Sequence, residues 1–130
     1  MGLALLDTTV LIDVLRGAPA GRRLLAMRES GDVPCACAIN VEEVVRSLRA
    51  NENAAVQALF DGLRIIPLRG HAGWQAGEWR SAYATRGVTL AQADCLIAGA
   101  AHCARARLCT GNPKDFPMVE LTVEHWPVGE

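Results

Sequence analysis

The sequence predicts one α/β domain in which a short parallel sheet is covered by helices on both faces. Its 130 residues match the size of a single domain, and a hydrophobic content of 51% is enough for a substantial core. Short apolar runs alternate with longer stretches of helical periodicity, the order expected of a parallel sheet. No internal repeat, linker or low-complexity tract interrupts this alternation. We therefore expect residues 1–130 to form one domain.

The first half of the chain contains two predicted strands and four predicted helices. Apolar residues three or four positions apart mark each helix, because that spacing places them on one face. Gly17 and the pair Ser30-Gly31 mark helix ends, and Asn40 is expected to cap the helix that follows it. In order, the predicted elements are a strand at Leu3–Leu6, a helix at Val10–Leu15, a helix at Ala20–Glu29, a strand at Val33–Ile39, a helix at Val41–Leu48 and a helix at Val56–Leu63.

The second half continues the alternation. Pro67 lies near the end of a short apolar run, and Arg86-Gly87 ends a longer helical stretch. In order, the predicted elements are a strand at Arg64–Leu68, a helix at Trp74–Thr85, a helix at Thr89–Ala104, a strand at Arg107–Thr110 and a last strand at Met118–Leu121.

Composition excludes several classes of protein. The 13 basic and 14 acidic residues nearly cancel, so net charge alone points to no nucleic-acid partner. The five cysteines are odd in number, lack a C-x-x-C pair and lie mostly in apolar segments, which favours buried, reduced thiols. The N-terminus lacks the features of a signal peptide, and no apolar stretch approaches the ~20 residues of a membrane span. We expect a soluble, cytoplasmic protein with no membrane association.

Four acidic residues fall at the same edge of the predicted sheet. Asp7 directly follows the first strand, and Asp115 lies in the loop after the Arg107–Thr110 strand. Glu43 and Asp94 lie near the starts of two helices, and helices that return across a parallel sheet begin at its carboxyl edge. Ligands bind at that edge in open α/β sheets, so we expect these four side chains to form one site.

Each of these acids also has a purely structural interpretation. Asp7 could cap the helix after it, Glu43 could complete a capping box with Asn40, and Asp115 could stabilise a turn. Asp94 is harder to explain in this way, because its helix is apolar on nearly every side and no Arg or Lys lies three or four positions away. A buried carboxylate without a partner costs several kcal/mol, so a bound cation is expected.

The chemistry of the four acids favours a hard cation. Carboxylate oxygens suit Mg²⁺ or Mn²⁺ rather than zinc, and the three histidines are scattered without ligand spacing. The sequence also lacks the Asp-x-Asp motif of aspartyl-phosphate phosphatases, a glycine-rich phosphate loop and the G-x-S-x-G motif of serine hydrolases. A hard cation held by the acids could activate a bound water.

Four segments resemble the PIN (PilT N-terminus) domain in their order and spacing. In length and single-domain form the chain is similar, within that family, to the VapC toxins, the ribonuclease halves of bacterial toxin–antitoxin pairs. The resemblance covers essentially the whole chain. Its segments are Leu5-Leu6-Asp7-Thr8-Thr9-Val10-Leu11-Ile12, the helix with Glu43, Ala93-Asp94-Cys95-Leu96-Ile97-Ala98, and Thr110-Gly111-Asn112-x-x-Asp115-Phe116.

The resemblance implies a three-layer α/β/α sandwich that acts as an Mg²⁺-dependent endoribonuclease toxin, with Mn²⁺ as a possible substitute, and leaves 5′-phosphate and 3′-hydroxyl ends. It assigns metal binding and catalysis to Asp7, Glu43, Asp94 and Asp115, and supporting roles to Thr9, Thr110 and Asn112. One departure is Glu42, where relatives often carry a small residue, and it leaves the choice between Glu42 and Glu43 open.

The resemblance also implies partners. They are an RNA substrate, a cognate antitoxin encoded by an adjacent gene and a second copy of the chain in a homodimer. Two apolar helix faces, at Val10–Leu15 and Val56–Leu63, exceed what a small sheet needs and favour the dimer. An antitoxin arginine is expected to enter the acidic site, because its fork can bind two carboxylates.

The RNA is expected to meet basic side chains around the site, since the acids alone would repel it. Setting the four site acids aside leaves 13 basic against 10 acidic residues. The candidates for phosphate contacts are Arg22, Arg23, Arg46, Arg49, Arg86 and Lys114.

Other functions stay open at this stage. The same fold could serve as a non-catalytic RNA-binding or protein-binding module, as a structure-specific DNA nuclease, or as an interaction domain in which the acids only cap helices. Intact acids disfavour the first, and the absence of long insertions disfavours the second. The sequence holds no code for which RNA is cut.

Overall fold

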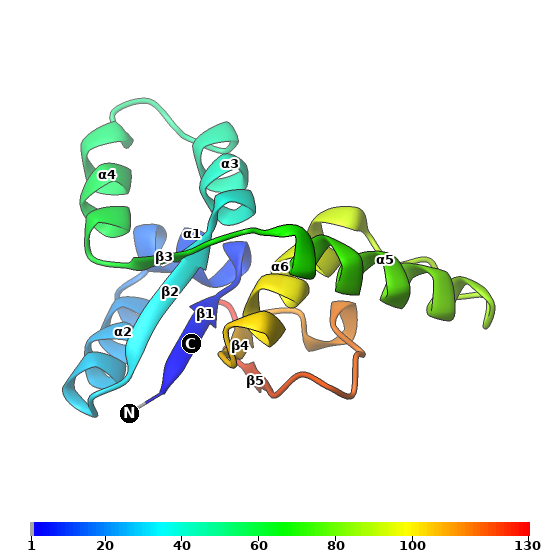
Figure 1. The fold of residues 1–130 in the computed structure, drawn as a ribbon. Helices are drawn as coiled ribbons and strands as arrows, with labels where there is room; N and C mark the ends of the chain where they lie inside the picture. The colour runs from blue at the N-terminus through cyan, green and yellow to red at the C-terminus, as the bar shows by residue number, and fades with distance from the viewer. Residues whose placement is uncertain (1) are drawn as a thin grey trace.

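The computed structural model describes residues 2–130 and contains a five-stranded, fully parallel sheet in the order β3-β2-β1-β4-β5 (Figure 1). β1 (Leu3–Leu6) lies in the centre, between β2 (Val33–Cys37) and β4 (Arg107–Thr110). β3 (Arg64–Ile66) and β5 (Val123–His125) form the edges. Because every strand runs the same way, their carboxyl ends share one edge of the sheet, and the loops and helix starts beyond them meet there.

Helices cover both faces of the sheet, as the sequence predicts. Figure 1 shows α1 and α2 on the far face and α6 on the near face, while α5 extends past the sheet. None of the helices in residues 2–130 combines the length and the apolar character that a membrane span requires. The helices are α1 (Thr8–Arg16), α2 (Ala18–Glu29), α3 (Ala38–Arg46), α4 (Asn53–Asp61), α5 (Gly70–Ala84) and α6 (Gln92–Cys103), with a 3₁₀ turn η1 (Pro113–Asp115).

Two cores, one on each face of the sheet, hold the three layers together. Successive strand residues point to opposite faces, so Leu5 packs with α5 and α6 while Ala4 and Leu6 pack with α1, α2 and α4. All three side chains are fully buried. The α/β/α sandwich inferred from the sequence is confirmed.

The apolar faces of α1 and α4 belong to the second of these cores. Val10, Leu11 and Val56 are buried, and Leu15 and Phe60 pack against them as partly buried residues. We expected these apolar helix faces to be larger than the sheet needs for its cover. That expectation is wrong, because the two faces pack against the sheet and against each other. A contact between two copies would have to use other surfaces.

The junction between β2 and α3 differs from the prediction. β2 ends at Cys37 rather than Ile39, because α3 already begins at Ala38. Cys37 is the residue that precedes the helix, and the Asn40 side chain accepts a hydrogen bond from its backbone N–H at 2.9 Å. Asn40 is thus the third helical residue instead of the cap, and the predicted capping box between Asn40 and Glu43 does not form.

The expected last strand at Met118–Leu121 is also wrong. This segment is a turn in which the backbone N–H of Leu121 donates to the Met118 carbonyl at 3.2 Å. Met118 is buried in the core of the α5–α6 face, so its apolar character reflects packing rather than strand pairing. The fifth strand begins two residues later, at Val123.

The cysteines follow the sequence expectation with one exception. All five are free thiols, and Cys35, Cys37, Cys95 and Cys109 are buried. Burial raises the pKa of Cys109 to about 12, aided by the nearby negative charge of Glu124, so this thiol stays protonated. Cys103, at the end of α6, is exposed and contradicts the prediction.

Candidate metal and catalytic site

The four acids singled out from the sequence line one cavity at the carboxyl edge of the sheet. The cavity has a volume of about 210 Å³. Asp7 reaches it from the end of β1, Glu43 from α3, Asp94 from the first turn of α6 and Asp115 from η1. The remaining lining residues are Thr8, Thr9, Arg46, Ser47 and Asn112.

Two threonine hydroxyls hold the Asp7 carboxylate in place. The hydroxyl of Thr110 donates to Oδ2 of Asp7 at 2.8 Å, and the hydroxyl of Thr9 donates to the same oxygen at 3.2 Å. Both Asp7 and Thr110 are buried. Burial raises the pKa of Asp7, the hydrogen bonds from Thr110, the Thr8 backbone and Thr9 lower it, and the charge of Glu43 raises it further.

The same two hydroxyls also hold the loop that leads to Asp115. Thr9 Oγ1 accepts a hydrogen bond from the backbone N–H of Gly111 at 2.9 Å, and Thr110 Oγ1 accepts one from the backbone N–H of Asn112 at 3.0 Å. Thr9, Thr110 and Asn112 therefore lie where the sequence placed supporting residues. Asn112 makes this bond through its backbone and is one of the residues that line the cavity.

Gly111 lets this loop lie against the C-terminal residues. A Cβ atom at Gly111 would come within 2.9 Å of Val128 Cγ2 and 3.3 Å of Thr9 Oγ1, which leaves little room for a larger residue. The neighbouring backbone N–H of Gly129 donates to Asp13 Oδ2 on α1 at 3.1 Å. The end of the chain thus packs between α1 and the loop that follows β4.

Glu43 is held by a different threonine. The hydroxyl of Thr8 donates to Oε1 of Glu43 at 2.6 Å, and the side-chain amide of Asn40 donates to Thr8 Oγ1 at 3.2 Å. Sequence reasoning missed this role of Thr8 and Asn40. The available signal was a pair of adjacent hydroxyl residues directly after Asp7.

The structure shows which of the adjacent residues Glu42 and Glu43 lies at the cavity. The Glu42 side chain is 63% exposed and pairs along the helix with Arg46 at 3.2 Å. The Glu43 side chain is 21% exposed, faces the cavity and lies 4.0 Å from the guanidinium of Arg46. Glu43 is therefore the acid of α3 that belongs to this cavity.

Asp94 carries the largest shift of pKa among the four acids. Partial burial, together with the negative charges of Asp7, Asp115 and Glu43, raises the pKa of Asp94 to about 6. Asp94 is less buried than expected, because it lies in the first turn of α6 and the fully buried part of the helix begins at Cys95. Within residues 2–130 it takes part in no ion pair.

The donor set of this cavity fits a hard divalent cation. Four carboxylates supply oxygen ligands, and a bound cation would relieve the repulsion that raises the pKa of Asp94. As they stand, no three His, Cys, Asp or Glu side chains of the described chain are close enough together to hold an ion. Cation binding would therefore require the four side chains to move closer together.

Of the basic residues proposed to contact RNA, Arg46 lies at the cavity itself. Arg23 instead stacks its guanidinium over the Trp126 ring, 5.3 Å from the centroid, and Arg86 stacks over Tyr83 at 4.1 Å. Arg49 and Lys114 are exposed, and Lys114 directly precedes Asp115 in η1. Arg22 is exposed on α2.

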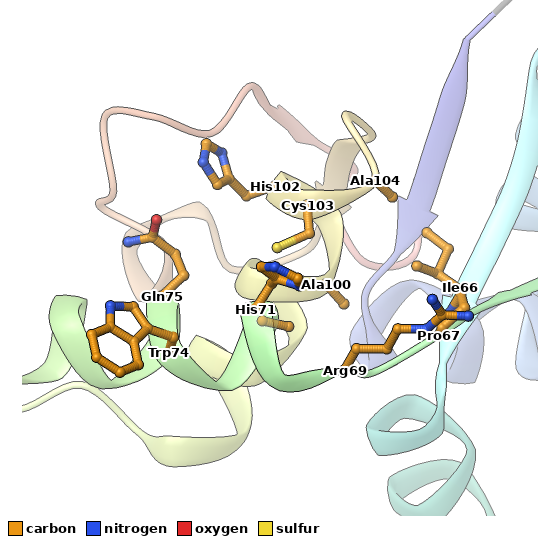
Figure 2. A pocket seen from close by; sticks show the side chains of 11 residues that line it. Ile66, Pro67, Arg69, His71, Trp74, Gln75, Ala100, His102, Cys103 and Ala104 are labelled. Carbon is orange, nitrogen blue, oxygen red and sulfur yellow. The ribbon is translucent and has the colours of Figure 1, made fainter.

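A larger cavity of about 700 Å³ lies between the end of β3, the start of α5 and the end of α6 (Figure 2). Size alone would make it the first candidate for a ligand site. Most of its lining is apolar, and none of the four acids reaches it. Its polar side chains are Arg69, His71, Gln75 and His102. The smaller, carboxylate-lined cavity is therefore the candidate site.

Comparison with known proteins agrees with this geometry. The sequence model of the PIN domain matches residues 4–120, most of the chain. The chain belongs to the PIN domain family. Ribonuclease VapC19 of Mycobacterium tuberculosis is 34% identical over 121 residues, which span 89% of this chain and 94% of that protein. Ribonuclease VapC10 of the same species is 29% identical over 119 residues, spanning 91% and 89% of the two chains.

Solved structures with the same PIN fold include toxin–antitoxin proteins. A chain of the DNA-bound VapBC structure from Salmonella typhimurium superposes with a TM-score of 0.83 at 23% identity, covering 97% of this chain and 99% of that one. A chain of VapBC2 from Rickettsia felis, bound to a promoter DNA fragment, gives a TM-score of 0.81 at 21% identity, with coverage of 95% and 98%. At these identities the likeness shows the fold.

We expect the elevated pKa of Asp94 to lower the stability of the metal-free protein at neutral pH. The pKa of Asp94 lies near 6 in the fold against 3.8 as the ordinary value, so its favourable contribution is complete below pH 3.8 and is lost as the pH rises through 6. In EDTA at pH 7.5, Asp94→Asn should raise the free energy of unfolding by about 1 kcal/mol, after allowance for solvent screening.

Urea unfolding of both proteins between pH 5 and 8 measures this difference. The gain from Asp94→Asn should shrink toward pH 5, where the wild-type carboxyl is increasingly protonated. A difference that does not change with pH would contradict the proposed repulsion.

Proposed function

We propose that this chain is a metal-dependent endoribonuclease, the toxin of a toxin–antitoxin pair. The observation that carries the proposal is that four carboxylates line one cavity of a PIN fold, where burial and the charges of the other three acids raise the pKa of Asp94. Relatives of similar length are named ribonucleases. Mg²⁺ is the proposed ion, with Mn²⁺ as a substitute, because both prefer oxygen ligands.

The acids and the threonines of this site have different proposed roles. Asp7, Glu43, Asp94 and Asp115 would hold the ion, which supplies a Lewis acid for phosphodiester hydrolysis. Thr9 and Thr110 fix the Asp7 carboxylate by hydrogen bonds to one oxygen, and their bonds to the loop backbone keep Asp115 beside the cavity.

Arg46 is the residue best placed to bind the RNA backbone. It lines the cavity, and its side chain is 65% exposed. It could exchange its surface pair with Glu42 for a phosphate, because such exposed pairs contribute little to stability. The other five basic candidates stay proposals for contacts further along the RNA.

The rival functions find less support. An interaction domain that uses the acids only as helix caps does not account for Asp7, whose buried carboxylate is held by the hydroxyl of Thr110 on β4. A non-catalytic module and a DNA nuclease make different biochemical predictions, so the cleavage assay includes RNA and DNA in parallel.

Asp94→Asn should reduce RNA cleavage at least ~100-fold, because loss of a direct ligand should cost as much as or more than loss of its outer partners. The variant should also relieve growth arrest when the protein is expressed. Cleavage of labelled RNA in Mg²⁺, with EDTA added to a parallel sample, measures the effect, and Mn²⁺ should restore the EDTA-treated wild type.

Glu42→Gln is the matched control, since Glu42 neighbours the site acid Glu43 but is exposed to solvent. It should retain activity within about 2-fold, as expected for a surface ion pair. A folded Asp94→Asn protein that cleaves RNA at the wild-type rate would remove the metal mechanism. Preference for DNA over RNA would favour the DNA nuclease.

The proposed partner is an antitoxin encoded by an adjacent gene, and the VapBC names of the structural relatives support it. The cavity gathers up to four negative charges, and in the described part of the chain Arg46 is the basic residue that lines it. An arginine from a partner could bridge two of the carboxylates through its planar fork. A disordered antitoxin segment could deliver that arginine while its apolar residues pack on the toxin.

A synthetic peptide of the antitoxin C-terminal half should bind the purified chain and inhibit cleavage. Replacing its arginine by alanine should weaken inhibition about 10-fold or more, the cost of a lost charge-assisted hydrogen bond. Inhibition should also weaken as Mn²⁺ is raised, because the ion and the arginine would compete for the carboxylates. If neither the full partner nor the peptide binds or inhibits, the toxin assignment fails even if nuclease activity survives.

A homodimer is proposed on a different surface from the one the sequence suggested. Trp74 is 75% exposed at the start of α5, and Ile65 is 47% exposed on the edge strand β3. Large apolar side chains that are exposed to this degree favour an interface.

Light scattering at micromolar concentration should give twice the monomer mass, and Trp74→Glu should shift the protein toward the monomer. A monomeric wild type would contradict the dimer, and a dimer unaffected by Trp74→Glu would place the interface elsewhere.

A further inference from the structure

Asn40 is a fully buried polar side chain that lies deeper in the fold than the acids. It lies in the first turn of α3, next to the end of β2, with no exposed surface. A buried amide must find partners for both of its ends. Its oxygen accepts a hydrogen bond from the backbone N–H of Cys37 at 2.9 Å, and its nitrogen donates to the hydroxyl oxygen of Thr8 at 3.2 Å.

This pairing fixes the direction of the hydrogen bonds. A backbone N–H can only donate, so the end of the Asn40 amide that faces Cys37 must be the oxygen. The NH₂ group then faces Thr8 and occupies a lone pair of its hydroxyl oxygen. The single hydroxyl proton of Thr8 is left for Oε1 of Glu43, 2.6 Å away. A distance this short is typical of a hydroxyl that donates to a charged carboxylate.

We propose that Asn40 and Thr8 are positioning residues that hold one oxygen of Glu43, so that its other oxygen faces the cavity and is ready to bind the cation. The inference rests on the proposed metal-dependent function. Oε2 is the freer oxygen, since its ion-pair contact with Arg46 is long, at 4.0 Å. We call this chain of hydrogen bonds, from Asn40 through Thr8 to Glu43, the relay. It restricts the Glu43 side chain before an ion binds, so that less conformational entropy is lost on binding.

The relay also couples Glu43 to Asp7. Thr8 and Thr9 are consecutive residues at the start of α1, and they donate to different acids: Thr8 to Glu43, and Thr9 to Asp7. One helical turn therefore sets the separation of two of the four carboxylates. Neither Thr8 nor Asn40 needs to touch the ion or the RNA for this effect.

The test compares Mn²⁺ binding by Thr8→Val and Thr8→Ser, measured by calorimetry in the absence of RNA. Valine keeps the shape of threonine but has no hydroxyl, so Thr8→Val should weaken Mn²⁺ binding about 10-fold, the range found for outer partners of metal ligands. Thr8→Ser retains the hydroxyl and should bind within about 2-fold of the wild type. At saturating Mn²⁺, Thr8→Val should regain most of the cleavage rate.

A second variant separates the relay from the local stability of α3. Asn40→Asp keeps an oxygen to accept from Cys37 but, when ionised, has no proton to donate to Thr8, so Thr8 would turn toward residue 40. It should weaken Mn²⁺ binding like Thr8→Val, and the double variant should be little weaker than either single one. Thr85→Val is the matched control, because Thr85 is exposed at the end of α5 and its hydroxyl donates to the Ala82 carbonyl, far from the acids in the sequence.

The outcomes distinguish the relay from the proposed function. Glu43→Gln serves as the reference for loss of a direct ligand. If Glu43→Gln loses Mn²⁺ binding while a folded Thr8→Val keeps wild-type affinity, the relay is overturned and the metal site stands. If the wild-type chain itself binds no Mn²⁺, the proposed metal-dependent function fails. Additive effects of the Thr8 and Asn40 variants would show that the two residues act separately, which also overturns the relay.

Discussion

The hydrogen bond by which Thr110 holds the Asp7 carboxylate, 2.8 Å long and shielded from water, is the contact on which the acidic cavity depends. It joins the ends of the two neighbouring strands β1 and β4. The backbone pairing of these strands also extends to Asp7, whose N–H donates to the Cys109 carbonyl. The same two hydroxyls also bind the loop after β4: Thr9 accepts a hydrogen bond from the backbone N–H of Gly111, and Thr110 accepts one from the backbone N–H of Asn112. The position of Asp115 follows from these bonds, because η1 begins directly after Asn112.

The cavity brings four acidic side chains near one another, and their electrostatic repulsion lowers the stability of the fold. Packing of the two cores stabilises the sandwich, and this stability keeps Asp94 partly buried and near the other three acids, which together raise its pKa to about 6. A structure that needed only a stable core would have no use for this repulsion. Such a cost is typical of an arrangement that serves binding rather than folding, in line with the proposed role of these acids.

Much of this site could be predicted because a parallel sheet imposes it. Residues after β1 and β4, and residues at the starts of α3 and α6, must meet at the carboxyl edge, so Asp7, Glu43, Asp94 and Asp115 converge whatever their contacts. The residues that fix their orientation were harder to find. Thr8 and Thr9 look alike in sequence, and only the placement of α3 relative to α1 decides which acid each one binds.

The errors also have physical causes. Asn40 was expected to cap α3, but Cys37 occupies that position and Asn40 is the third residue of the helix. Apolar character predicted both a strand at Met118 and spare helix faces on α1 and α4, whereas all three are used in the cores. Hydrophobicity reports that a side chain is buried, but it does not say which neighbour buries it.

The packing of Val128 and Gly129 against the Gly111 loop and α1 has a practical consequence for anyone who handles this protein. An affinity tag or fusion partner joined after Glu130 would begin three positions after Val128, whose side chain lies against Gly111 in the loop that leads to Asp115. The opposite end of the chain enters the sheet at Leu3, where Gly2 is held by Asp32 at the amino edge. Purification handles are therefore better attached at the start of the chain, where they leave the carboxylates undisturbed.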